Sequence, residues 1–257
     1  MAVLLQNSKL PQIYTYIIMN KIYFTIKLLD INIGIECMYD STRAFCAGYE
    51  TDEETDFTVS VKQTDIEFER GRSIADLGYD FSDAYLETLA VYRKISEKIP
   101  FYDGFLFHSS AIAVDGQAYL FTAKSGTGKS THTRLWRKYF GDRAVMVNDD
   151  KPFIKVADTP LVYGTPWNGK HRLGSNISVP IKAICILTRS EDNYIYPISG
   201  AEALPMLIQQ TYRAYDGAAL SKTMTLLDKL IKQVRFYKLG CNMDIEAAKI
   251  AYEGMRE

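Results

Sequence analysis

A short glycine-rich string carries the most specific chemistry in this chain. Residues 123 to 130 read AKSGTGKS, which fits the phosphate-loop pattern with alanine at its first position. Gly126 and Gly128 let successive backbone N–H groups turn inward toward phosphate oxygens, and the following helix adds the partial positive charge of its N-terminus. Lys129 would reach the β- and γ-phosphates, and the Ser130 hydroxyl would bind Mg²⁺. We therefore predict a site for ATP and Mg²⁺.

The residues expected to contact the nucleotide share this loop and the first turn of the helix after it. They are Ser125, Gly126, Thr127, Gly128, Lys129, Ser130 and Thr131. Thr131 is more typical of a helix residue than of a second metal ligand. The alternative interpretation of the whole string is a glycine-rich turn that leads into a capped helix.

A pair of carboxylates follows the next expected strand. Asp149 lies 20 residues beyond Lys129, and Asp150 comes directly after it. One acid can bind the metal, directly or through water, while the other takes a proton from an attacking hydroxyl. The alternative is an acidic turn that ends the strand before Pro152.

The order and spacing of these motifs resemble the catalytic domain of the HPr kinase/phosphorylase family, which shares the phosphoenolpyruvate carboxykinase-like fold. The resemblance covers residues 101 to 190 and includes His108, upstream of the phosphate loop. It implies that Asp150 is the catalytic base and that Asp149 is the acid on the metal side, together with Ser130. It also places His108 in the catalytic set, although a packed histidine bonded to backbone is the alternative.

The segment after the acid pair departs from that family. Its E-x-R-G signature is missing, and residues 165 to 172, TPWNGKHR, occupy the place. The chain therefore resembles the distant HPr-kinase-like proteins with a P-W-x-G-K loop, and we expect no phosphorylase activity toward HPr. Lys170 and Arg172 would place positive charge on the transferring phosphoryl group, unless they are solvated cations of a surface loop. Trp167 would line an acceptor pocket.

Four further side chains support weaker predictions. His132 and His171 are more typical of structural or exposed positions, because no second His or Cys stands at ligand spacing. Arg213, at the end of an expected helix, could clamp a phosphate, but a surface ion pair is the commoner role. Cys185 lies in an apolar run and is expected in the core.

The elements that must position these residues indicate an α/β protein in two parts. Residues 1–100 form a β-rich lobe with a closing helix, and residues 101–257 form an HPr kinase-like nucleotide-binding catalytic domain. In the first part we expect strands at 13–18, within 23–35, at 58–61 and at 65–69, and a helix at 83–98.

The second part begins with a hairpin, because Asp115-Gly116 separates two apolar runs. In an ordinary P-loop NTPase the loop follows a parallel strand of a βαβ unit, so a hairpin here points to a different fold. The expected strands are 111–114, 117–122, 143–147, 153–156, 181–187 and 235–239. The expected helices are 129–140, 201–212, 217–233 and one from residue 244, with a loop at 164–178.

Composition excludes several classes of protein. Of the 257 residues, 47% are hydrophobic and 24% are charged, which is typical of soluble globular proteins. A net charge of -1 argues against nucleic acid or an anionic membrane as a partner. The four cysteines are scattered and predict neither a zinc site nor a disulfide framework, so a reducing cytoplasm fits best. The first 20 residues do not read as a signal peptide.

These observations predict an ATP- and Mg²⁺-dependent kinase. It would transfer the γ-phosphoryl group to a hydroxyl of a small metabolite, or of a serine in a peptide or protein. One alternative is an ATP-binding regulatory or sensor protein; another is carboxykinase-like transfer, which would need a second metal site. The resembled family forms rings, so a homo-oligomer is also an expectation.

Overall fold

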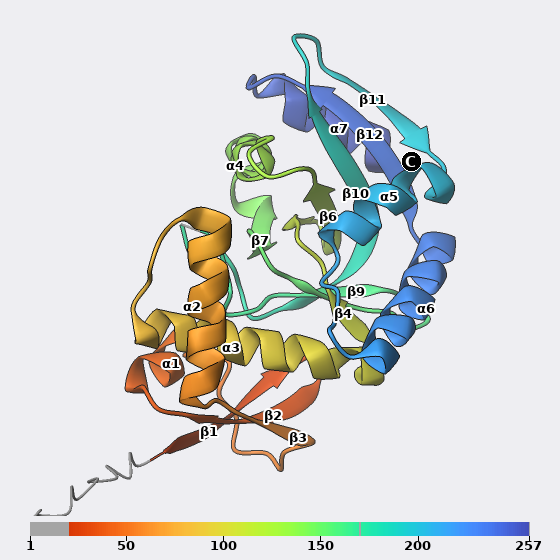
Figure 1. Ribbon diagram of the computed structural model, residues 1–257. Coiled ribbons are helices and arrows are strands. Elements are labelled where there is room, and N and C mark those ends of the chain that lie inside the picture. The colour runs from red at the N-terminus through yellow and green to blue at the C-terminus, as the bar shows by residue number, and fades with distance from the viewer. Residues whose placement is uncertain (1–20, 170, 257) are drawn as a thin grey trace, which may run out of the picture.

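The computed structural model describes residues 21–169 and 171–256. It is a mixed α/β structure in which a small sheet and its helices pack against one end of a larger sheet (Figure 1). The strand expected at 13–18 and the side chain of Lys170 lie outside the described residues. Within the described residues, no helix combines the length and apolar character needed to cross a membrane.

From residue 21 onward, the described N-terminal part holds a three-stranded sheet in the order β1-β2-β3 and three helices. Its elements are β1 (Ile22–Leu28), β2 (Ile31–Cys37), α1 (Asp40–Phe45), β3 (Phe57–Ser60), α2 (Gln63–Leu77) and α3 (Asp83–Lys98). The expected strands within 23–35 are thus β1 and β2, joined by a two-residue turn. Leu29 and Asp30 in that turn both have positive φ, 52° and 59°, as a tight hairpin with right-handed twist requires.

The strand expected at 65–69 is wrong, because these residues belong to helix α2. Asp65 caps the helix by accepting the backbone N–H of Lys62 at 2.9 Å. Ile66 and Ser73 lie on its buried face at helical spacing, and Gly78 ends it with φ 65°. The described residues of the N-terminal part therefore combine a small sheet with three helices.

Among the residues that the structure describes, the larger sheet has nine strands, with β4-β8-β9-β10-β6-β5-β7 in order and β12 and β11 attached beyond β10. The strands are β4 (Gly104–Leu106), β5 (Ser110–Val114), β6 (Gln117–Thr122), β7 (Ala144–Asn148), β8 (Phe153–Lys155), β9 (Leu161–Tyr163), β10 (Ser178–Arg189), β11 (Tyr194–Ile198) and β12 (Arg235–Cys241). The long β10 joins the two halves: its start pairs antiparallel with β9, and the rest pairs parallel with β6 and β12. The predicted hairpin is confirmed as β5–β6.

Helices cover both faces of this sheet. They are α4 (Lys129–Phe140), α5 (Gly200–Gln210), α6 (Gly217–Gln233) and α7 (Glu246–Arg256), with short 3₁₀ turns at Ile99–Tyr102 and Gly141–Arg143. Side chains of β6 alternate between the faces, since Tyr119 and Phe121 pack in the cluster of α4 and α7, whereas Leu120 packs in the cluster of α5 and α6. This alternation fixes β6, and so the loop after it, between two packed layers.

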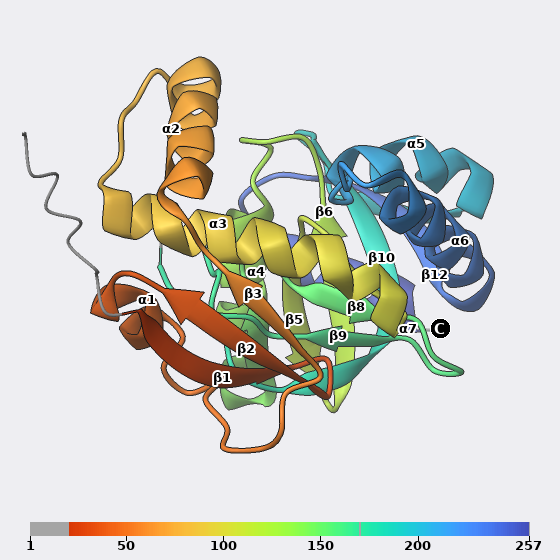
Figure 2. The ribbon, with the colours of Figure 1, turned by 60° about the horizontal axis from the view of Figure 1, so that its bottom comes forward.

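Helix α3 lies between the small sheet and strands β8 and β9 (Figure 2). One hydrophobic cluster runs through this region and includes Phe153, Tyr163 and Trp167 beside residues of β1, β2 and α3. Trp167 is only 3% exposed, and its indole N–H donates to the Thr88 carbonyl at 2.9 Å. The expectation that Trp167 lines an acceptor pocket is wrong: it is a core residue that joins the two parts.

Candidate active site

The phosphate-loop string lies between β6, which ends at Thr122, and α4, which begins at Lys129. Gly126 and Gly128 have φ of 77° and 122°, a region that side chains rarely adopt, so the loop shape requires glycine at both. Lys129 is 9% exposed and donates to the Ala123 carbonyl at 3.3 Å. Burial lowers the pKa of Lys129, while the carboxylates of Asp150 and Asp149 act in the opposite direction. The loop lysine and the acid pair therefore share one site.

An arginine that sequence reasoning missed ties the loop to the next strand. Arg189 ends β10, and its guanidinium donates to the carbonyls of Gly126 at 2.6 Å and Thr127 at 3.3 Å. Because β10 runs parallel to β6, the end of β10 arrives beside the loop. Arg189 could have been found only from the parallel pairing of β10 with β6, and the sequence alone did not reveal that pairing.

Asp149 lies in the interior at the end of β7. It is 4% exposed, and its carboxylate accepts a hydrogen bond from the Ser110 hydroxyl, which also lies 3.2 Å from the Thr133 hydroxyl. A Cβ built on Gly169 would lie 3.3 Å from Asp149 Oδ2. The loop that carries the P-W-x-G-K string thus passes directly over Asp149.

Asp150 is partly exposed and pairs with His108, whose Nε2 lies 2.9 Å from Asp150 Oδ1. Lys151 Nζ lies 3.8 Å from the other carboxylate oxygen. Burial raises the pKa of Asp150, but the His108 hydrogen bond and the charges of Lys151, His108 and Lys129 outweigh it and hold the pKa below its ordinary value. Asp150 is therefore an ionised carboxylate at neutral pH.

Backbone contacts fix the positions of His108 and Asp150. Asn148 Oδ1 accepts the N–H groups of Asp150 at 2.8 Å and Lys151 at 2.7 Å, which shapes the turn after β7. The backbone of His108 donates to Gln210 at 2.8 Å and accepts from the Thr122 hydroxyl at 3.1 Å. The imidazole is left to contact Asp150, so His108 is not the backbone-bonded histidine of the alternative interpretation.

The donor set near the loop fits Mg²⁺ bound together with a triphosphate. Ser130 offers an exposed hydroxyl and Asp149 a carboxylate, and Mg²⁺ prefers such oxygen ligands. Among residues 21–169 and 171–256, no cluster of three or more His, Cys, Asp or Glu side chains could hold a metal ion. One or two protein oxygens completed by phosphate and water is the usual arrangement for Mg²⁺.

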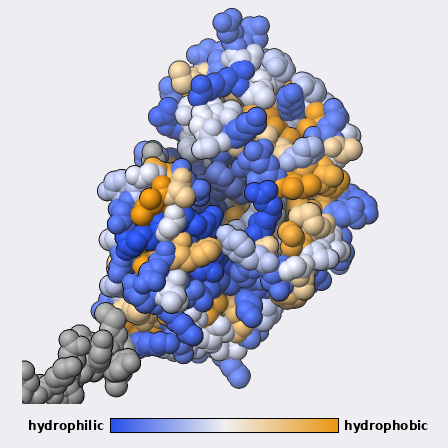
Figure 3. Space-filling model, in the orientation of Figure 1, coloured by the Kyte–Doolittle hydropathy of each residue, from blue (hydrophilic) through white to orange (hydrophobic). Residues whose placement is uncertain are grey.

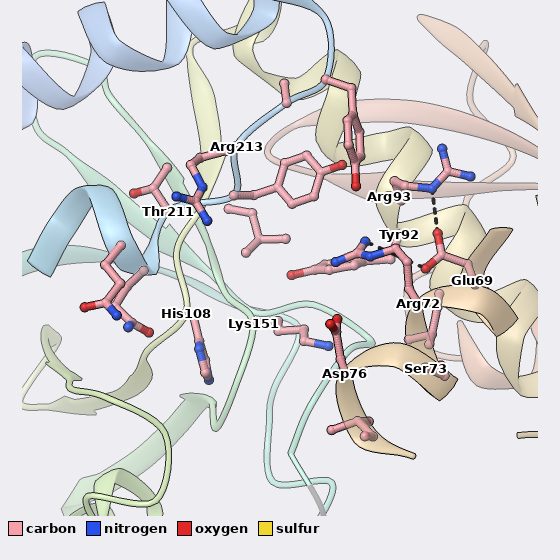
Figure 4. A pocket seen from close by; sticks show the side chains of 18 residues that line it. Glu69, Arg72, Ser73, Asp76, Tyr92, Arg93, His108, Lys151, Thr211 and Arg213 are labelled. Carbon is pink, nitrogen blue, oxygen red and sulfur yellow. Dashed lines mark hydrogen bonds and ion pairs between the residues drawn. The ribbon is translucent and has the colours of Figure 1, made fainter. Parts of the chain in front are cut away.

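His108 also lines a pocket of about 750 Å³. The pocket lies between α2 and α3 of the N-terminal part and the segment 209–215, which spans the end of α5 and the residues after it. Figure 3 shows the hollow between these two sides of the molecule. His108 and Lys151 belong to its wall, whereas residues 123–131 do not (Figure 4). Asp150 does not itself line this pocket, but it contacts two residues of the pocket wall, His108 and Lys151.

Comparison with known proteins gives a family. Residues 81–244 match the model described as "SynChlorMet cassette protein ScmC". The chain belongs to the ScmC family. The ScmC-family chain is also similar to a solved structure titled "Structure of the Hpr(Ser) kinase/phosphatase from Coxiella burnetii", with 10% identity and a TM-score of 0.32, over 58% of this chain and 94% of the other. No curated protein matches it.

Arg172, His171 and His132 of this ScmC-family chain were also singled out from the sequence. The Arg172 guanidinium carbon lies 5.8 Å from the centroid of the Phe45 ring in α1, and His171 is exposed. His132 is 2% exposed and accepts the indole N–H of Trp136 at 3.0 Å. Burial lowers the pKa of His132 to about 3, so it is a neutral core residue. Cys185 is fully buried in β10, as expected.

Proposed function

We propose that this ScmC-family chain is a kinase that uses ATP and Mg²⁺ to phosphorylate a hydroxyl of an acceptor. One observation carries the proposal: an ionised Asp150 lies near the loop lysine and contacts His108 and Lys151, two wall residues of a separate pocket. A nucleotide on one side and an acceptor on the other would place the γ-phosphate and the hydroxyl on either side of this carboxylate. Mg²⁺ bound at Ser130 and Asp149 would neutralise charge on the phosphates.

The side chains would divide the work as follows. Asp150 accepts the proton of the acceptor hydroxyl and orients its oxygen toward the phosphorus atom. A carboxylate of lowered pKa is a weak base, but phosphoryl transfer passes through a loose transition state in which positioning matters more than base strength. Lys129 and the N–H groups of the loop bind the phosphate oxygens, and His108 keeps Asp150 in place.

An acceptor assay tests the proposal against the sensor alternative. γ-labelled ATP and Mg²⁺ are incubated with the protein and with source-cell extract split by size, and transfer of label to extract components is measured. We expect label on one size class with the wild-type chain and not with Asp150→Asn. If ATP binds but no label moves and ATP loss does not depend on extract, the chain is an ATP-binding regulator instead.

A further inference from the structure

We infer that the pocket between α2, α3 and residues 209–215 binds the phosphoryl acceptor, and that Arg213 selects an acceptor bearing a carboxylate. This inference rests on the proposed kinase function. The pocket meets the catalytic site at His108 and Lys151, so a molecule lying in it can extend a hydroxyl to Asp150. The phosphate loop contributes no wall residue, which leaves the pocket for the second substrate.

Charge in the pocket favours an anion. Four cationic side chains and two acidic ones line it: Arg72, Arg93, Lys151, Arg213, Glu69 and Asp76. Arg93 is already occupied, because it donates to Glu69 at 2.5 Å and to Asp65 at 3.1 Å. Lys151 is only loosely paired with Asp150, at 3.8 Å. A net positive pocket with acidic groups nearby suits a single carboxylate better than a doubly charged phosphate.

Arg213 is the cation with most freedom to bind that carboxylate. In the described part of the chain, the arginines that form ion pairs are Arg43, Arg70, Arg72, Arg93 and Arg143. Arg213 is not among them, and its exposed side chain lines the pocket (Figure 4). A guanidinium can bind a carboxylate through two parallel hydrogen bonds. The surface ion pair considered from the sequence is therefore absent among the described residues.

Two buried hydroxyls in the pocket wall are independent signs of a ligand. The hydroxyl of Tyr92 and that of Thr211 have no hydrogen-bond partner within the described residues, although the residues are only 8% and 4% exposed. Leaving a buried hydroxyl unpaired costs free energy, and such groups usually find a partner. Burial raises the pKa of Tyr92 well above its ordinary value, so its phenol stays protonated and able to donate. Both residues line the pocket, so oxygens of a bound acceptor would reach these hydroxyls once the side chains turn toward it.

The volume of the pocket and the residues at its mouth indicate the size and the apolar character of the acceptor. A volume of about 750 Å³ lies in the range that holds a drug-sized molecule. Leu77 and Tyr215 line the pocket and are 70% and 67% exposed, which leaves apolar surface at its mouth. The acceptor then combines a hydroxyl, a carboxylate and an apolar body, whether it is a metabolite or a peptide.

Blocking carboxylates in the acceptor pool tests the inference. Source-cell extract is treated with a carbodiimide and methylamine, which convert carboxylates to amides and leave hydroxyls intact, and a sham-treated portion receives quenched reagent. Each portion is split into small-molecule and macromolecular fractions and incubated with γ-labelled ATP, Mg²⁺ and the full chain. We expect label in one sham-treated fraction and its loss after amidation; the fraction that carries the label shows whether a metabolite or a larger chain supplies the carboxylate.

Variants connect the effect to Arg213. With limiting sham-treated extract, Arg213→Ala should lower the labelling rate roughly 10- to 100-fold, the effect of losing a charge-assisted hydrogen bond. Arg213→Lys should fall between that variant and wild type, and the affinity for ATP measured by calorimetry should not change in either. Arg235→Ala removes an exposed arginine of β12 outside the pocket and should match wild type.

The possible failures are distinct. Label that persists after amidation, or an Arg213→Ala variant as fast as wild type, overturns the carboxylate inference and leaves the kinase proposal standing. No transfer of label to sham-treated extract by wild type overturns the kinase proposal and this inference with it.

Discussion

A carboxylate can act as a base only if it is ionised and held still. Asp150 meets both conditions, because His108 contacts one oxygen at 2.9 Å and Asn148 binds its backbone N–H. Asp149 differs, since it is buried and accepts a hydrogen bond from Ser110. Two adjacent acids in different environments are suited to different roles.

Exchange of each acid for its amide should separate these roles. Asp150→Asn keeps the size of the side chain but cannot accept the proton, so transfer of label should fall roughly 10²- to 10⁴-fold. Its affinity for MgATP, measured by calorimetry, should change little. Asp149→Asn should weaken Mg²⁺ binding and so raise the Mg²⁺ concentration that gives half-maximal transfer. A reversed pattern, in which only Asp149→Asn stops transfer, would exchange the two assignments.

Two lysines of the phosphate loop provide a matched pair for the nucleotide site. Lys129 is buried beside the acid pair, whereas Lys124 is exposed at the start of the loop. Lys129→Ala should raise the dissociation constant for MgATP at least 10-fold, the loss of about one charge-assisted hydrogen bond. Lys124→Ala should bind as wild type does in the same titration. Equal affinities for Lys129→Ala and wild type would remove the loop from the nucleotide site.

At the scale of elements, helices with a regular apolar pattern and strands separated by a clear turn could be predicted from the sequence. Helices α3 and α6 begin and end at the predicted residues, 83–98 and 217–233, and the β5–β6 hairpin follows from its Asp-Gly turn. Helix α2 was missed because its buried face holds few apolar residues, and Glu69 lies on it. That face is stabilised by ion pairs with α3, which no local pattern reveals.

The α2–α3 ion pairs should make stability depend on pH. Asp65 binds Lys94 at 2.9 Å and Arg93 at 3.1 Å. Burial raises the pKa of Asp65, but Lys94, the backbone N–H of Lys62 and Arg93 outweigh it and lower the pKa below its ordinary value. The stabilisation is therefore complete above the pKa of the unfolded chain, about 3.9, and is lost as pH falls through the lower folded pKa.

Urea unfolding of Asp65→Asn measures that contribution. At pH 7 we expect a loss of about 1.5–3 kcal/mol in the free energy of unfolding, the usual effect of hydrogen bonds to a charged group. The difference from wild type should shrink as the pH is lowered from 5 toward 3. Asp192→Asn, an exposed residue between β10 and β11, serves as control and should show no difference at any pH. If the difference in free energy of unfolding between Asp65→Asn and wild type stays constant with pH, the charge of Asp65 is not what stabilises α2.

The whole molecule brings together parts that are distant in sequence. The phosphate loop and the acid pair could be predicted because each is a local string. Strands β6 and β7 both run antiparallel to β5, so they bring the loop and the acids to the same end of the sheet. The pocket could not be predicted from the sequence, because its walls come from α2, α3 and residues 209–215, which are distant in sequence. Glu97 of α3 accepts the Tyr212 hydroxyl at 2.8 Å and the Tyr215 N–H at 3.0 Å, which fixes the segment that carries Arg213.

The shared core should make the two parts unfold together. The chain has two tryptophans: Trp136 packs in α4, and Trp167 packs where the small sheet and α3 meet β8 and β9. In Trp136→Phe the fluorescence of Trp167 reports on that junction, and in Trp167→Phe the fluorescence of Trp136 reports on the phosphate-loop layer. Within each variant we expect the urea midpoint from fluorescence to coincide with that from far-ultraviolet circular dichroism.

If Trp167 fluorescence changes at a lower urea concentration than circular dichroism does, residues 1–100 and 101–257 are separate folding units, as the sequence suggests. Coincident midpoints in both variants would instead make the pocket a feature of one cooperative unit, because the helices and the segment that form it could not part without unfolding the whole.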